Sequence, residues 1–135
     1  MLRSALARAN DTVKRIVVTS SCSAVLTVDP GNVRHFSEED WNEQSIRDVE
    51  AKGRDTSNGN KYNASKTLAE RAAWKFVEEN KGRANFDLVT INPPFVYGPF
   101  LHEVKRAEDL NTSALEFYLS VAKGNKTTEQ LTTIR

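Results

Sequence analysis

The feature that most constrains the fold is a long helix-forming segment between two short apolar runs. The first run, Ile16 to Val18, is β-branched throughout, and the second covers residues 86–91. Runs of this length and composition are typical of buried strands. Two parallel strands need a long crossover, which is usually helical, and the helix expected from Tyr62 to Asn80 can supply it. The order therefore predicts an α/β fold with a parallel sheet.

The central helix is predicted from the spacing of its apolar residues, which form one stripe at helical intervals. The stripe consists of Leu68, Ala69, Ala72, Ala73, Phe76 and Val77. Its small alanines would allow the helix to pack closely on a sheet, and Lys81–Gly82 is a suitable helix end because glycine readily adopts the left-handed conformation.

The remaining segments give weaker signals. The start of the chain has apolar residues at helical spacing, which favours an amphipathic helix, although Arg3 and Arg8 without a nearby acid also resemble a mitochondrial transit peptide. We expect a turn at Asp29–Pro30–Gly31, a short helix starting within 37–41, a surface loop over 53–60 and a last helix over 113–123. The polar tail, residues 126–135, shows no clear period.

Composition limits the classes of partner and site. The 135 residues are enough for one domain at most, and 19 basic against 18 acidic residues leave a net charge of +1, so charge gives no case for nucleic acid or an anionic membrane. No apolar run approaches the roughly 20 residues of a membrane span. The single cysteine, Cys22, fits a reducing compartment, and we expect a cytoplasmic protein. Because His35 and His102 lack metal-ligand spacing, no metal site is predicted.

Hydroxyl side chains follow the first predicted strand directly, at Thr19, Ser20 and Ser21. Ligands of open α/β sheets bind just beyond the carboxyl ends of the strands, so this cluster is well placed for chemistry. The alternative is that the serines only cap the next turn.

A second candidate pair is Tyr62 and Lys66, in the segment YNASK. Side chains four residues apart lie on the same helical face, so the Lys66 ammonium could lie near the Tyr62 phenol. Taken alone, this spacing is a weak signal, because it arises readily by chance. Farther along, Pro93 and Pro94 follow the second predicted strand and must end it, since proline cannot join a central ladder.

Three segments in this order resemble the extended short-chain dehydrogenase/reductase family: TSSCSAV, YNASK and NPPFVYGPF. Flanking segments such as EEDWN and SKTLAERAAWKFVEEN are similar to the branch that contains dihydroflavonol reductase, cinnamoyl-CoA reductase and methylglyoxal reductase. The resemblance implies a Rossmann-type, doubly wound parallel sheet. It covers nearly the whole chain, so residues 1–135 would form part of one NAD(P)-binding domain.

The resemblance also implies roles for three side chains. Tyr62 would give a proton to the substrate carbonyl oxygen as hydride reaches the carbon from the nicotinamide. Lys66 would favour the ionised form of Tyr62 through its charge and would hydrogen-bond the cofactor ribose. Ser21 would hydrogen-bond the carbonyl oxygen and stabilise developing charge, with Ser20 and Ser23 as near neighbours that could be mistaken for it.

The cofactor implied by the resemblance is NADPH, with NADH left open. The backbone from Pro93 to Val96 would line the nicotinamide. The implied activity is reduction of a small aldehyde or ketone. Two alternatives stay open. One is a portion of an NAD-dependent sugar epimerase or dehydratase, since VYGP also resembles segments of those enzymes. The other is a truncated non-catalytic protein that binds a full-length relative.

The family's glycine-rich phosphate-binding turn has no counterpart among the six glycines of this sequence. We therefore expect a middle portion of the family's fold, with its first βαβ units upstream of Met1 and most of its substrate lobe missing. Such a slice would leave strand edges unpaired and would be marginally stable by itself.

Overall fold

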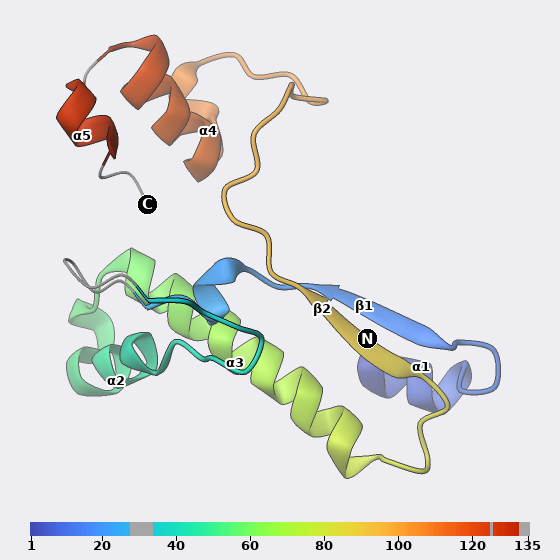
Figure 1. Ribbon diagram of the computed structural model, residues 1–135. Helices are drawn as coiled ribbons and strands as arrows, with labels where there is room; N and C mark the ends of the chain where they lie inside the picture. Colours follow the sequence, from blue (N-terminus) through green and yellow to red (C-terminus); the bar gives the residue numbers. More distant parts are fainter. Residues whose placement is uncertain (28–33, 125, 133–135) are drawn as a thin grey trace. The chain divides into compact units, whose positions relative to one another are not determined.

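The computed structural model describes residues 1–27, 34–124 and 126–132. The chain divides into two compact units, residues 1–94 and 95–135. The turn predicted at Asp29–Pro30–Gly31 lies outside the described residues. The first unit holds both strands and the longest helix, so it contains the predicted strand–helix–strand arrangement (Figure 1).

The sheet is a parallel pair of strands. β1 (Arg15–Thr19) pairs in register with β2 (Asp87–Ile91), and the crossover between them carries α2 (Glu43–Lys52) and α3 (Asn58–Glu79). Within the described part of the chain this sheet has two strands. The predicted α/β class and parallel pairing are confirmed, with β2 starting one residue after Phe86.

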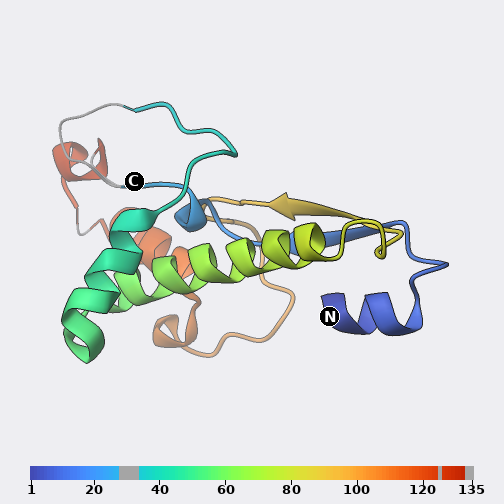
Figure 2. The same cartoon turned by 90° about the horizontal axis from the view of Figure 1, so that it is seen from below.

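One face of the sheet is covered by helices. Ile16 and Leu88 are paired across the strands and form a buried cluster with Ala73 of α3 and with Phe86. The predicted first helix is confirmed as α1 (Leu2–Arg8), which packs its apolar residues against this cluster alongside α3 (Figure 2).

The opposite face of the sheet is largely uncovered within the described residues. Val17 of β1 and Ile91 of β2 are 50% and 51% exposed, although both are β-branched. Because successive side chains alternate between faces, these residues point away from the side that carries Ile16 and Leu88.

The buried face of α3 matches the predicted apolar stripe at Ala73, Phe76 and Val77 and departs from it in the first half of the helix. Leu68 is 53% exposed, and the helix instead buries Thr67 and Glu70, together with Ala64 and Ala73. The stripe prediction fails here because both buried polar groups have hydrogen-bond partners, and a satisfied polar group can be buried at low cost.

The helix predicted to start within 37–41 begins later, so that prediction is wrong in position. Residues 37–40 close a turn in which the Ser37 N–H donates to Asp40 Oδ2 at 2.8 Å. Helix α2 starts at Glu43, where Asn42 Oδ1 accepts from the Ser45 N–H at 3.0 Å. Both Ser37 and Asn42 are good cap residues, so local preference alone did not decide between them.

The surface loop predicted over 53–60 is also partly wrong. Residues Gly53–Asp55 form a 3-10 turn, and α3 already starts at Asn58, where Ser57 Oγ accepts from the Asn60 N–H at 3.2 Å. At its other end α3 stops at Glu79, followed by Gly82 at a φ of 83°, a conformation that favours glycine.

The second unit is helical in its later part. The predicted last helix appears as α4 (Thr112–Phe117), which continues into a π-helical turn (Tyr118–Ala122). The Asn111 side chain caps α4 by accepting from the Ala114 N–H at 3.0 Å. The tail, where the sequence shows no clear period, contains the short helix α5 (Thr128–Thr132).

Among the described residues, no helix is both long and apolar enough to cross a membrane.

Candidate active site

The first turns of α3 carry the predicted pair Tyr62 and Lys66. Lys66 Nζ lies 5.7 Å from the centre of the Tyr62 ring, so the spacing of four residues does bring the cation and the phenol together. The Tyr62 side chain is accessible, at 49% exposed. Within the described structure neither the Tyr62 hydroxyl nor the Lys66 ammonium has a hydrogen-bond or ion-pair partner, so both can act on a bound molecule.

Ser21 lies just past β1 in extended conformation and is only 7% exposed. Its Oγ accepts from the Ser23 N–H at 3.2 Å and so caps the 3-10 helix η1 (Cys22–Ala24). A hydroxyl that accepts one hydrogen bond still has its own proton to donate. Ser21 therefore caps the next turn, as the alternative predicted, and keeps a donor available; its role in chemistry stays a prediction.

The two neighbours of Ser21 have different surroundings. Ser23 supplies the backbone N–H that binds Ser21. Ser20 Oγ is buried and has no hydrogen-bond partner among the described residues.

Helix η1 is held against α3 and α2 by three hydrogen bonds. The Thr67 hydroxyl shares its single proton between the Asn63 carbonyl of its own helix at 2.9 Å and the Ala24 carbonyl at 3.3 Å. Asn42 Nδ2 donates to the Ser23 carbonyl at 3.1 Å, and its backbone N–H donates to the Ala24 carbonyl at 2.8 Å. Because Thr67 follows Lys66 directly, the serine segment is anchored to the same part of α3 that carries the candidate pair. Among the described residues Ser21 forms no direct hydrogen bond with Tyr62 or Lys66.

The two ends of the predicted cofactor segment fall in different units. The Pro93 carbonyl accepts from the Cys22 N–H at 3.0 Å, so Pro93 lies beside the serine segment. Val96 is 68% exposed and belongs to the second unit. The structure thus places Ser21 near Pro93 at the carboxyl end of the sheet, and Tyr62 near Lys66 on α3.

Comparison with known proteins identifies the family. The sequence is 44% identical over 109 residues to an uncharacterized oxidoreductase of Saccharomyces cerevisiae, covering 78% of this chain and 30% of the relative. It is 37% identical over 107 residues to the NADPH-dependent methylglyoxal reductase GRE2 of the same yeast, with coverage of 78% and 30%. The chain belongs to the short-chain dehydrogenase/reductase family.

The fold agrees with this family membership. The crystal structure of yeast methylglyoxal/isovaleraldehyde reductase Gre2 complexed with NADPH matches at a TM-score of 0.61 and 35% identity, covering 84% of this chain and 32% of that one. The match confirms the predicted Rossmann-type fold and the methylglyoxal reductase-like branch. No family model matches the sequence. The chain spans about 30% of the length of the curated relatives it matches.

Three residues that the sequence did not single out contribute to this site: Asn42, Glu70 and Asn92. Asn42 ties α2 to η1, as described above. Asn92 Nδ2 donates to the Ser21 carbonyl at 3.0 Å and to Glu70 Oε2 at 2.8 Å. An asparagine between a strand and two prolines was the available signal, since a polar amide there can replace backbone donors that proline lacks.

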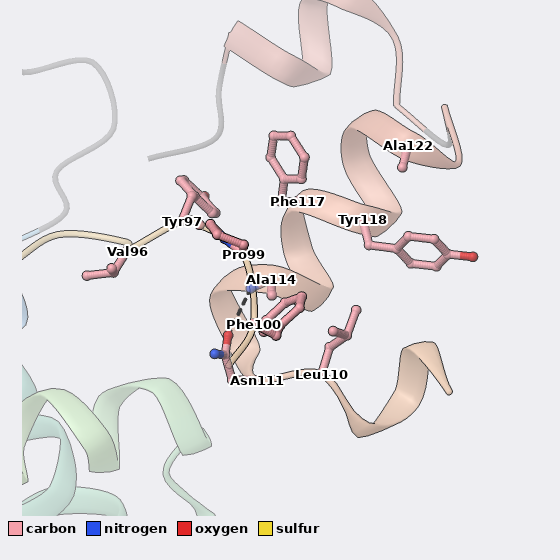
Figure 3. A pocket seen from close by; sticks show the side chains of 11 residues that line it. Val96, Tyr97, Pro99, Phe100, Leu110, Asn111, Ala114, Phe117, Tyr118 and Ala122 are labelled. Atoms are coloured by element: carbon pink, nitrogen blue, oxygen red, sulfur yellow. Dashed lines mark hydrogen bonds between the residues drawn. The ribbon is translucent and has the colours of Figure 1, made fainter. Parts of the chain in front are cut away.

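The second unit contains an apolar pocket of about 620 Å³. Its lining is mainly aromatic and aliphatic, with the Tyr97 and Phe117 ring centres 5.4 Å apart (Figure 3). The lining comes from residues 96–100, from Leu110 and Asn111 just before α4, and from α4 with its π-helical turn. Pockets of this size and polarity suit small organic ligands.

No group of three or more His, Cys, Asp or Glu side chains suited to holding a metal occurs in the described ranges.

Proposed function

We propose that the polypeptide carrying this chain is an NADPH-dependent carbonyl reductase that acts on small aldehydes or ketones. The proposal is carried by the accessible Tyr62 hydroxyl beside the unpaired Lys66 ammonium on α3. It is supported by similarity to an NADPH-dependent methylglyoxal reductase. The single cysteine supports the cytoplasm as the compartment.

NADPH supplies the hydride that reaches the carbonyl carbon. Tyr62 Oη gives its proton to the carbonyl oxygen, so that one hydride and one proton convert the carbonyl to an alcohol. The positive charge of Lys66 stabilises the phenolate left on Tyr62. Ser21 donates its hydroxyl proton in a hydrogen bond to the same oxygen and stabilises its developing negative charge.

The residues present fit the nicotinamide-ribose part of the cofactor. Lys66 has three N–H donors and, in the described structure, no acceptor engaging them, so they are free for ribose hydroxyls. Pro93 and Val96 are proposed to line the nicotinamide through their backbone.

The first experiment is an immunoblot of source cells with an antibody against the Tyr62 helix. A band well above 15.1 kDa identifies the longer polypeptide in which activity should be assayed. A band at 15.1 kDa, with no turnover by the purified chain, would contradict the proposal and favour a non-catalytic role.

The decisive variant is Tyr62→Phe in that native polypeptide, assayed by NADPH consumption with methylglyoxal as the probe carbonyl. We expect kcat to fall by about 10²–10⁴-fold, the usual contribution of a positioned general acid, with NADPH affinity nearly unchanged. Lys66→Met should also lower kcat. Its matched control is Lys75→Met, because Lys75 is an exposed lysine near the other end of α3. Equal turnover by Tyr62→Phe and wild type would overturn the assignment.

A further inference from the structure

Glu70 is a carboxylate on the buried face of α3, which it shares with Thr67 and Ala73. It is 6% exposed. Its Oε2 accepts from Asn92 Nδ2 at 2.8 Å, and its Oε1 accepts a long hydrogen bond of 3.5 Å from the Trp74 indole. Among the described residues no cation pairs with it. A buried carboxylate with only neutral donors is costly to desolvate, so its presence calls for a reason besides packing.

Asn92 connects this carboxylate to the candidate site. The two N–H hydrogens of one amide nitrogen can serve two acceptors, here Glu70 Oε2 and the Ser21 carbonyl oxygen. Asn92 therefore bridges Ser21, just past β1, and the helix that carries Tyr62 and Lys66.

The end of the sheet needs this bridge because the backbone cannot complete it. Pro93 and Pro94 have no N–H, so the chain after β2 donates no further backbone hydrogen bonds at these positions. The remaining backbone links come from the segment after β1: the Ser20 N–H donates to the Ile91 carbonyl at 2.8 Å, and the Cys22 N–H donates to the Pro93 carbonyl at 3.0 Å. These links flank Ser21, and its own carbonyl is held by the Asn92 side chain.

Helix α3 connects the anchored serine segment to Tyr62 and Lys66. Glu70 lies four residues after Lys66 and eight after Tyr62, so all three project from one side of a continuous helix over about 12 Å. Thr67, between them, binds the Ala24 carbonyl at 3.3 Å. The serine segment is thus attached to α3 at two points, Thr67 and Glu70.

We propose that Glu70 and Asn92 are positioning residues that fix the Ser21 hydroxyl relative to Tyr62 and Lys66. This inference rests on the proposed reductase function. Neither residue touches the reacting atoms: Asn92 orients the Ser21 segment, and Glu70 orients Asn92. Loss of this positioning would weaken stabilisation of the transition state and so lower kcat, since Ser21 acts on charge that develops only there.

The test uses Glu70→Ala, Asn92→Ala and the double variant in the native polypeptide. Misplacing a catalytic group by about 1 Å can lower turnover by about 10²-fold, so we expect each single variant to lower kcat by about 10–10²-fold with KM for methylglyoxal nearly unchanged. The double variant should lose little more than either single variant, because both act through one bridge. Glu70→Gln, which keeps an acceptor for Asn92, should retain most activity.

The matched control is Glu79→Ala, which removes an exposed glutamate of the same helix and should leave kcat unchanged. Assays are run below the unfolding temperature of every variant. Losses of thermal stability with unchanged kcat, or fully additive losses of kcat, would overturn the proposal and assign the pair a purely structural role.

A readout that does not depend on turnover separates this inference from the proposed function. Amide hydrogen exchange at Ser23 and Ala24 reports how firmly the serine segment is held. If wild type shows no carbonyl reduction, the proposed function fails. Faster exchange there in both Asn92→Ala and Glu70→Ala would then still support the positioning bridge, and unchanged exchange would overturn it.

Discussion

The two ends of the parallel sheet are held together by different chemistry. At the amino end, the exposed Arg15 guanidinium binds Asp87 in a fork, with Nε to Oδ1 at 2.8 Å and Nη2 to Oδ2 at 2.5 Å. At the carboxyl end, neutral donors bind backbone carbonyls of the serine segment: the buried Thr67 and the half-buried Asn92. An exposed ion pair is weakened by water and salt and leaves its partners mobile, whereas buried hydrogen bonds fix positions. The carboxyl end of the sheet, which carries the candidate site, is therefore the end at which residue positions are held more firmly.

The largest effect on stability should come from the core beside the amino end. Leu88→Ala removes a buried side chain and should lower the free energy of unfolding by about 2–5 kcal/mol, measured by urea denaturation. Ile91→Ala on the same strand is the matched control and should cost clearly less, because Ile91 is half exposed. Equal losses would mean that the uncovered face of the sheet is buried in the native polypeptide, and the comparison between faces would fail.

A smaller loss is expected from Asn42 at the carboxyl end. Asn42→Ala removes the cap of α2 and also leaves the Ser23 carbonyl without that donor. We therefore expect the free energy of unfolding, measured by thermal unfolding, to fall by about 1–3 kcal/mol. Asn111→Ala is the comparison, because Asn111 caps α4 through one hydrogen bond. It should cost about 1 kcal/mol. If both cost the same, the link from Asn42 to the serine segment contributes nothing.

The smallest effect concerns the pH dependence at the amino end. The hydrogen bond and charge of Arg15 hold the pKa of Asp87 below its ordinary value. The folded pKa is thus lower than the unfolded one, so this contribution is present above about pH 4 and is lost as the pH falls through the folded pKa.

Asp87→Asn should therefore slightly reduce the loss of stability on acidification, measured by thermal unfolding across an acidic pH series. Arg15→Met should reduce this loss to the same extent, since it removes the other half of the pair. An unchanged loss in both variants would show that the ion pair has no role in stability, and would sharpen the contrast with the carboxyl end.

The sequence predicted the topology because its signals are local. β-Branched runs and helical spacing depend on neighbouring residues, so β1, β2 and the existence of α3 could be read directly. The buried face of α3 could not, because Glu70 is satisfied by Asn92, which is distant in sequence. The start of α2 was missed for the same reason: Asn42 is favoured over Ser37 by its additional bond to the Ser23 carbonyl.

The candidate site was predictable only as far as its motifs reach. Ser21, Tyr62 and Lys66 were named from three short segments, and the structure pairs Tyr62 with Lys66 as the spacing indicates. Their proposed roles in catalysis stay predictions. The bridge through Asn92 was out of reach, because it joins three segments whose proximity only the fold creates.

The in-register pairing of β1 with β2 also has a consequence for how the chain folds. Arg15 and Asp87 are 72 positions apart, so the sheet can close only after a long loop has been ordered. Closing such a loop costs chain entropy before any strand contact is gained, which slows folding relative to proteins with local contacts. The helices α2 and α3, joined by a short turn, can form before the strands pair. Helix α3 then provides a surface against which β1 can pack before β2 pairs with it.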